Sequence, residues 1–374
     1  MQSRRDFLKK ASLTASAGFL LSHGLSAKAF DSEKASPGMW RMPDEDLPQE
    51  CVFLAYAASS AVWKDFAPDV NRTIAMLART ISRYQPVTIF CREDQEDDAR
   101  EACGTQNIDY FPLPLDDIWV RDYGGCFVRN ADGDLALVDF NFNGWGDKQR
   151  HGKDTQVARL LGDDLKIACI KSRLTGEGGG IEVDGHGTAI LTESCWVNAN
   201  RNPGMTRAQI EAELKLRLGL RKIIWLPGIK DEDITDAHVD FYARFVKPGV
   251  VVANLDEDPE SYDYDVTRKH LQILRSATDA DGRRLQVHIL PPPTEIRSNI
   301  YTEDDSSFAA GYINYLPING AVIAPQFGDE EADERCRRLL ASLYPGRAVV
   351  QVNIDPIAAG GGGIHCVTKN MPRV

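Results

Sequence analysis

Short apolar runs alternate with amphipathic segments along most of this 374-residue chain. Residues 52–57 form a continuous apolar run typical of a buried strand. Residues 69–84 repeat apolar side chains at helical spacing, at Val70, Ile74, Leu77 and Ile81. The same succession returns, with two or three predicted strands between helices, roughly every 60–70 residues. That period is too long for a solenoid, so it predicts an α/β fold of about five strand-rich units around a centre.

The same periodicities give the individual elements. We predict helices at 69–84, 95–103, 155–161, 206–218, 259–276 and 329–342. We predict strands at 52–57, 87–90, 108–113, 135–140, 167–171, 181–183, 188–191, 222–226, 239–246, 250–254, 286–290, 312–315, 321–324 and 348–352. Residues 130–133 and 184–187 have the composition of hairpin turns. Thr206 and Gln209 have capping-box spacing, and Gly219 ends the helix that they begin.

The N-terminus has the features of an export signal. The pair Arg4-Arg5 precedes a weakly apolar stretch at 13–25, and small residues follow at 27–29. The stretch is too short for a membrane span, which needs about 20 apolar residues. We therefore predict a twin-arginine signal peptide at 1–29, an irregular segment at 30–49 and a catalytic domain at 50–374. The mature protein is then expected to be soluble and periplasmic or secreted, after contact with the twin-arginine translocation machinery and without stable membrane insertion. The alternative is a short amphipathic helix that stays in the mature protein.

Charge and cysteine content narrow the function classes. The formal net charge is −12 and no long run of Lys or Arg occurs, which argues against a nucleic-acid partner. An acidic chain is compatible with a small cationic substrate. The eight cysteines are scattered without a C-x-x-C pair, and a chain of this length can bury a core without disulfides.

Two polar clusters stand out in the first half of the chain. Trp119 and Asp122 could offer a flat face and a bidentate acceptor to one planar cation, although an ordinary surface ion pair beside a core tryptophan is the simpler reading. Glu177 precedes three glycines that let the backbone approach a neighbour closely. This cluster has no phosphate-loop or dinucleotide spacing, and a hairpin with an exposed acidic end explains it equally well.

Two further clusters carry a histidine and a thiol. His238 and Asp240, two residues apart on a predicted strand, would share one face, as an acid/base pair or as metal ligands. No spacing supplies further ligands, so we expect no metal. Cys366 follows four glycines at 360–363 and is a candidate nucleophile. His186 and His365 are set aside, because the neighbour of a nucleophile generally points elsewhere.

Several long motifs resemble the agmatine deiminase and bacterial-type peptidylarginine deiminase family. The matching segments are WVRDYG, EGGGIEVDGHGT, residues 200–203, DAHVDFYARF, YINYLPINGAVIAPQFG and GGGGIHCVTKNMP, in order from about Asp44 to the C-terminus. The resemblance implies the pentein fold, in which five ββαβ-like units surround a pseudo-fivefold axis and the active site lies in the central channel. This agrees with the five-unit rhythm of the sequence.

The resemblance also implies a mechanism. Cys366 would be the nucleophile and His238 the general acid/base, while Asp122 and Asp240 would accept the guanidinium N–H groups. Glu177 would orient the histidine, and Trp119 would line the substrate channel. No metal or organic cofactor is implied, because the guanidinium already carries the positive charge that a metal would supply.

The substrate is expected to be a small cationic guanidine, agmatine or an arginine derivative. Family members acting on peptidyl arginine are thought to hold a carboxylate with arginines shortly after the hairpin that follows RDYG. Here residues 141–147 contain no cation before Lys148 and include Asp147, which favours agmatine. The predicted export favours the alternative, a peptidylarginine deiminase, because an exported enzyme meets peptides whereas agmatine metabolism is usually cytoplasmic. A guanidinium- or polyamine-binding protein without catalysis is a further alternative, against which the thiol and histidine argue. A metallohydrolase that binds its metal ion through His238 and Asp240 would lack a third and a fourth ligand.

Overall fold

Five small mixed sheets hold the strands of the computed structural model, which describes residues 40–303 and 307–373. In each sheet one pair of neighbours is antiparallel and the next pair is parallel, with a helix between the parallel strands, and the four-stranded sheet adds a second parallel pair. The strands, in sheet order, are β16 (Lys369–Pro372), β1 (Gln49–Tyr56), β2 (Val87–Cys91) and β3 (Ile108–Pro112); β4 (Cys126–Arg129), β5 (Leu135–Asp139) and β6 (Ala168–Lys171); β7 (Glu182–Val183), β8 (Thr188–Thr192) and β9 (Lys222–Leu226); β10 (Ala243–Lys247), β11 (Val250–Ala253) and β12 (Gln286–Ile289); β13 (Leu316–Ile318), β14 (Ala321–Gln326) and β15 (Ala348–Asn353). The predicted α/β architecture of five strand-rich units is confirmed.

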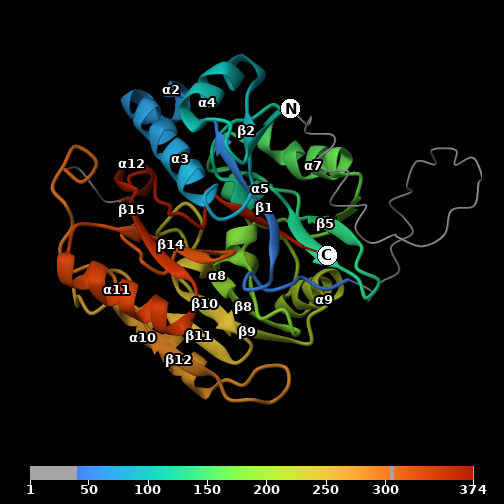
Figure 1. Cartoon of the computed structure of the whole chain (residues 1–374). Coiled ribbons are helices and arrows are strands. Elements are labelled where there is room, and N and C mark those ends of the chain that lie inside the picture. Colours follow the sequence, from blue (N-terminus) through green and yellow to red (C-terminus); the bar gives the residue numbers. More distant parts are fainter. Residues whose placement is uncertain (1–39, 304–306, 374) are drawn as a thin grey trace, which may run out of the picture.

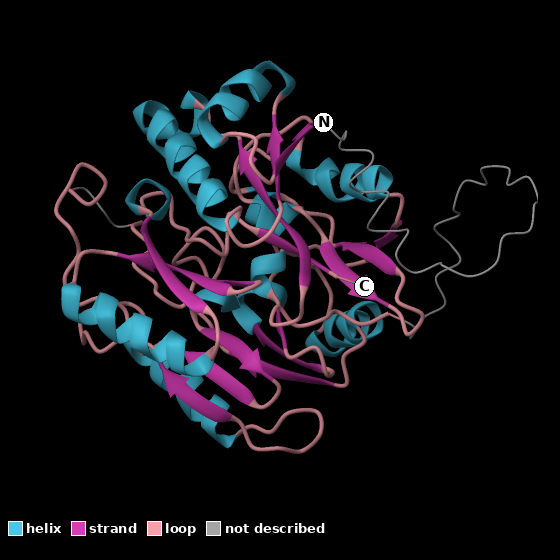
Figure 2. Cartoon of the chain, in the orientation of Figure 1, coloured by secondary structure: helices cyan, strands magenta, loops and turns pink. Residues whose placement is uncertain are grey.

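The long helices lie outside the strands, whereas the short helices α5 (Val120–Tyr123) and α8 (Glu193–Trp196) lie near the middle (Figures 1 and 2). The long ones are α3 (Ala67–Ile81), α4 (Glu96–Cys103), α7 (Val157–Leu165), α9 (Arg207–Leu218), α10 (Tyr264–Ser276) and α11 (Glu330–Leu343). The short ones are α2 (Ser60–Trp63), α5 (Val120–Tyr123), α6 (Gly144–Asp147), α8 (Glu193–Trp196) and α12 (Asp355–Ala358). Helix α3 buries Val70, Ile74, Leu77 and Ile81 completely, as its apolar spacing predicts.

The last strand of the chain completes the first sheet. Strand β16 pairs antiparallel with β1, and Phe53 faces Lys369 in the register. This pairing closes the ring of units by bringing the last described strand next to the first. Cys366, which directly precedes β16, is thereby carried inward from the C-terminal region.

The predicted turns and caps have the expected geometry. In the first hairpin, the Asn130 side chain accepts hydrogen bonds from the backbone of Asp132 and Asp134, and Gly133 has a φ of 89°. Thr206 and Gln209 form a complete capping box, and Gly219 ends α9 in the left-handed conformation.

Two predicted strands are wrong in part. The strand at 239–246 begins only at Ala243, and Val239–Phe241 form a 3-10 turn. Side chains replace the strand hydrogen bonds here: Asp233 accepts from the backbone of Ala237, and Thr235 accepts from the backbone of His238. The strand at 312–315 lies instead at Leu316–Ile318. Its residues turn inward, where the Tyr312 hydroxyl donates to Asp333.

The predicted signal peptide and residues 30–39 lie outside the described residues. Of the irregular segment, residues 40–49 are described, and the Glu45 side chain reaches buried partners. No helix among the described residues has the length and apolarity of a membrane span.

Candidate active site

The predicted site residues come from connections between successive sheets. Asp122 lies between β3 and β4, Glu177 between β6 and β7, and both His238 and Asp240 between β9 and β10. Cys366 lies between β15 and β16. Four of the five connections around the ring thus carry the predicted chemistry. The structure brings all these side chains together.

Glycines allow the Cys366 loop to pack closely on its neighbours. A Cβ on Gly362 would lie 2.2 Å from the Trp119 ring, and one on Gly363 would lie 2.4 Å from Oδ1 of Asn314. The carboxamide of Asn314 contacts the nucleophile candidate twice: its Oδ1 accepts from the Cys366 backbone N–H at 3.3 Å, and its Nδ2 lies 3.3 Å from Sγ. The glycine run therefore lets the backbone pack closely against the Trp119 ring and the Asn314 amide.

His238 lies between two carboxylates. Its Nε2 is 3.2 Å from Glu177 Oε2, and its Nδ1 is 3.7 Å from Asp122 Oδ1. Glu177 in turn accepts from Arg201 Nε at 2.9 and 3.1 Å. Burial disfavours the charged imidazolium. The negative charge of Asp122 and the hydrogen bonds that His238 forms with Cys195 and Glu177 outweigh burial, and they raise the pKa of His238 well above its ordinary value. At neutral pH the histidine is therefore a protonated group that can donate a proton.

The two aspartates differ in their partners. Asp122 accepts from the backbone N–H of Gly179 and from Trp145 Nε1, both at 2.9 Å. Oδ2 of Asp240 is 2.8 Å from His365 Nδ1 and 3.7 Å from Cys366 Sγ. Oδ1 of Asp240 is buried and has no hydrogen-bond partner among the described residues. A buried carboxylate oxygen without a donor is costly, so this atom is suited to an N–H group brought by a ligand.

Gly179 stands between the acid/base candidate and both carboxylates. A Cβ at this position would lie 2.7 Å from His238 Nδ1, 2.8 Å from Asp122 Oδ1 and 3.2 Å from Asp240 Oδ2. Any side chain here would displace them. The backbone at Gly179 thus approaches its neighbours closely, as the glycines after Glu177 predict.

Trp119 is buried beside the nucleophile loop. Its Nε1 donates to Asp117 Oδ2 at 3.0 Å, and its ring centroid lies 5.8 Å from that of Trp63. These contacts fix the ring against Gly362, so Trp119 can offer a rigid apolar wall next to Cys366.

Comparison with known proteins decides the family. A family model for Porphyromonas-type peptidyl-arginine deiminases matches residues 41–372. The chain belongs to this family. Agmatine deiminase of Stutzerimonas stutzeri is 37% identical over 353 residues, which cover 88% of this chain and 95% of the relative.

Two solved structures of this deiminase family extend the likeness to three dimensions. Agmatine deiminase of Enterococcus faecalis is 31% identical, covers 89% of this chain and 96% of its own, and has a TM-score of 0.84. A cysteine-to-serine variant of C. jejuni agmatine deiminase with substrate bound is 26% identical, covers 89% and 96% of the two chains, and has a TM-score of 0.80. The pentein fold expected from the motifs is therefore confirmed.

This deiminase has a second thiol near the histidine. Cys195 Sγ lies 3.6 Å from Glu177 Oε2, and the two residues form a compact group with His238. This thiol faces the Nε2 side of the ring, where Glu177 lies, whereas Asp122 faces the Nδ1 side. Cys366 Sγ lies 3.7 Å from Oδ2 of Asp240, the carboxylate whose other oxygen, Oδ1, has no partner among the described residues. The geometry therefore favours Cys366 as the nucleophile.

The group of Glu177, Cys195 and His238 has ligand atoms within 4.8 Å of one another. A soft divalent cation would accept such ligands. However, Arg201 already donates to both oxygens of Glu177, and its fixed positive charge opposes a cation at this position. The residues present do not fit a metal well, and we derive no step through one.

Sequence reasoning missed several residues of the deiminase site. Asn314 occupies the connection between β12 and β13, for which no candidate was proposed, and the fivefold pattern is the signal that could have found it. Trp145 holds Asp122 from a strained loop in which its φ is 57°. His365, set aside from the sequence, points to Asp240. His186 stays exposed in its hairpin.

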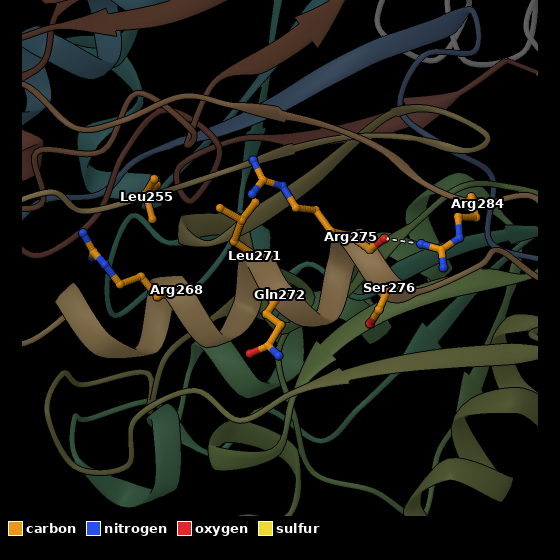
Figure 3. Close-up of a pocket in the computed structure, with 7 residues that line it drawn as sticks. All are labelled: Leu255, Arg268, Leu271, Gln272, Arg275, Ser276 and Arg284. Carbon is orange, nitrogen blue, oxygen red and sulfur yellow. Dashed lines mark hydrogen bonds between the residues drawn. The ribbon is translucent and has the colours of Figure 1, made fainter.

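A surface pocket of about 460 Å³ lies on the outer helix α10, in the fourth unit (Figure 3). Its lining contains none of the predicted site residues and consists of Leu255, Arg268, Leu271, Gln272, Arg275, Ser276 and Arg284.

Proposed function

We propose that this chain is an agmatine deiminase, which converts agmatine and water to N-carbamoylputrescine and ammonia. The observation that carries the proposal is the buried Oδ1 of Asp240, which has no partner among the described residues, on a carboxylate whose other oxygen lies 3.7 Å from Cys366 Sγ and which, like Asp122, borders Gly179. A planar guanidinium offers N–H donors in a fork that suits two carboxylates. The names of the relatives support the same substrate.

The proposed reaction begins with attack of Cys366 Sγ on the guanidinium carbon. Asp122 and Asp240 hold the cation in place and keep it planar. The bond to one terminal nitrogen breaks as His238 donates its proton, and ammonia leaves. A covalent thiouronium on Cys366 remains.

A water molecule then completes the cycle. His238, now neutral, removes a proton from the water as it attacks the thiouronium carbon. The C–S bond breaks, and the ureido product and the free thiol are released. Glu177, fixed by Arg201, keeps the imidazole ring oriented through both steps.

Substrate binding also bears on the state of the thiol. Burial, Asp240 and Asp122 raise the pKa of Cys366 well above its ordinary value, so the resting thiol is protonated. A bound guanidinium neutralises the field of both carboxylates and favours the thiolate. The thiol proton leaves to solvent, where it combines with the departing ammonia to give ammonium. The same cation therefore serves as substrate and as the charge that prepares the nucleophile.

The cations around the site support agmatine over arginine. Lys148, the first cation after residues 141–147, pairs with the buried Asp236 at 3.0 Å. Arg201 pairs with Glu177 and Asp236. Neither is free to receive a substrate carboxylate. Asp147 contributes less than its position in the sequence suggests, since its side chain is 79% exposed and well screened.

A ureido assay with two substrates tests this proposal. We expect kcat/KM for agmatine to exceed that for free arginine by at least about a hundredfold, because an unpaired carboxylate costs a few kcal/mol when desolvated. Blocked arginine amide serves as a control without a free carboxylate. A preference for free or C-terminal arginine would overturn the assignment, and absence of ureido product from every guanidine would leave the non-catalytic binding protein.

We also propose that the protein is exported by the twin-arginine pathway, on the basis of residues 1–29 alone. Conservative replacement of Arg4 and Arg5 by lysine keeps the charge but removes the guanidinium pair. We expect the unprocessed precursor to remain in the cytoplasmic fraction, while the unaltered chain is recovered outside it at the smaller size. Equal distribution of both chains would contradict export by this route.

A further inference from the structure

Glu45 joins the N-terminal segment to the back of the site. Its carboxylate accepts from Arg121 Nη1 at 2.5 Å and from Arg244 Nη2 at 2.8 Å. It also lies 3.1 Å, through both oxygens, from His365 Nε2. The side chain is 19% exposed, whereas the two arginines are almost completely buried. A residue of the segment before β1 thus reaches the interior of the ring.

The two arginines form a rigid frame for this carboxylate. Arg121 also donates to the His365 carbonyl at 3.1 Å and to Asn370 at 2.8 Å. Arg244 also donates to Glu182 and to the Tyr315 carbonyl, both at 2.8 Å. Because each guanidinium is held by at least two further acceptors, Glu45 has a defined position.

His365 connects Glu45 to Asp240. One ring nitrogen faces Glu45, and the other lies 2.8 Å from Asp240 Oδ2. Burial, Arg121 and Arg244 lower the pKa of His365, so the neutral ring carries one N–H and donates to one carboxylate at a time. Rotation of the ring would lose that bond. His365 therefore occupies one oxygen of Asp240 and leaves the other, Oδ1, without a partner.

We propose that Glu45 and His365 are positioning residues that act through Asp240. Glu45 fixes the His365 ring, His365 holds Oδ2, and the free Oδ1 of Asp240 is thereby presented to the guanidinium. This inference rests on the proposed function, since it assumes that the ligand at Asp240 is a guanidinium. It assigns a role in the site to the segment 40–49, far in sequence from every residue of the proposed mechanism.

Agmatine binding to the Cys366→Ser variant tests the proposal without turnover. Calorimetry would compare this variant with and without Glu45→Gln. We expect the added change to raise Kd about tenfold, as for loss of one charge-assisted hydrogen bond. Asp46→Asn is the matched control, because Asp46 neighbours Glu45 but is itself 43% exposed and pairs with the partly buried Arg347. It should leave Kd within about twofold.

A double-variant cycle separates positioning from a merely structural effect. If Glu45 acts through His365, then Glu45→Gln should add little to the weakening caused by His365→Gln. Full additivity of the two effects would overturn the proposal. So would unchanged agmatine binding in the Glu45→Gln variant. If Glu45→Gln does not fold, because it leaves two arginines without this carboxylate, Glu45→Asp retains the charge and serves in the same cycle.

The two proposals fail in different ways. If Cys366→Ser with Glu45 intact does not bind agmatine, the proposed function is wrong and Asp240 is not a guanidinium acceptor, which also overturns the role of Glu45. If it binds agmatine and the Glu45 and His365 variants bind equally well, only the positioning role is wrong.

Discussion

Replacement of Cys366 by serine is expected to lower ureido production from agmatine by at least about a thousandfold. The serine hydroxyl is far less acidic than a thiol, so the covalent step fails near neutral pH. The fold should persist, because serine is close in size and Asn314 can donate to its hydroxyl. Steady-state assays and the unfolding temperature of both chains give the measurement.

Cys195→Ser is the matched control for this prediction. Cys195 is also buried and is grouped with His238 and Glu177, but it lies on the opposite side of the imidazole from Asp122. Its replacement should reduce activity only modestly. The nucleophile assignment would be reversed if Cys195→Ser abolished turnover and Cys366→Ser retained it.

Asp122→Asn and Asp240→Asn are each expected to cost about 2–5 kcal/mol in kcat/KM. Each change removes a charged acceptor and introduces an amide N–H that faces the N–H groups of the guanidinium. Asp333→Asn is a control: Asp333 is also buried and hydrogen-bonded, but in the fifth unit, on α11. It should change stability without changing kcat/KM. Near-normal kinetics in both site variants would place the guanidinium elsewhere.

The two aspartates should differ in their effect on stability. Burial raises the pKa of Asp122 despite the opposing charge of His238, and Asp240 and Glu177 raise it further, so its ionised form is less favourable in the empty site than in the unfolded chain. Asp122→Asn should therefore leave the unfolding temperature unchanged or raise it. Burial acts the same way on Asp240, but the hydrogen bond from His365 and the nearby positive charges outweigh it and lower the pKa. Its ionised form stabilises the fold above the ordinary aspartate pKa, so Asp240→Asn should lower the unfolding temperature at neutral pH.

The architecture could be predicted because it depends on local signals. Helix α3 has its apolar stripe in the sequence, and the turn at 130–133 and the cap at Thr206 are formed by residues close together in the chain. The strand at β16 could not be predicted in this way. Lys369–Pro372 has no alternating pattern, and it becomes a strand because β1 lies beside it.

The candidate site was predictable where a motif carries chemistry in its own residue types. A thiol after glycines and a histidine near an aspartate are visible in the sequence. The error at 239–246 arose because a strand would also place His238 and Asp240 on one face, whereas the structure brings them together in a turn. Asn314, Trp145 and Glu45 act through contacts with residues far away in the chain. An amide, an indole or a carboxylate alone does not indicate such a contact.

The pairing of β16 with β1 also constrains when the enzyme can first become active. A ribosome releases the chain from its N-terminus, so β1 and most of the ring are available before β16 exists. Cys366 and β16 are made after every other described strand, and they are held by a strand from the first sheet. Contacts between such distant segments form late and slowly. A growing chain that has not reached residue 366 therefore contains the carboxylates and the histidine but not the proposed nucleophile, and this thiol meets its partners only after β16 has been made.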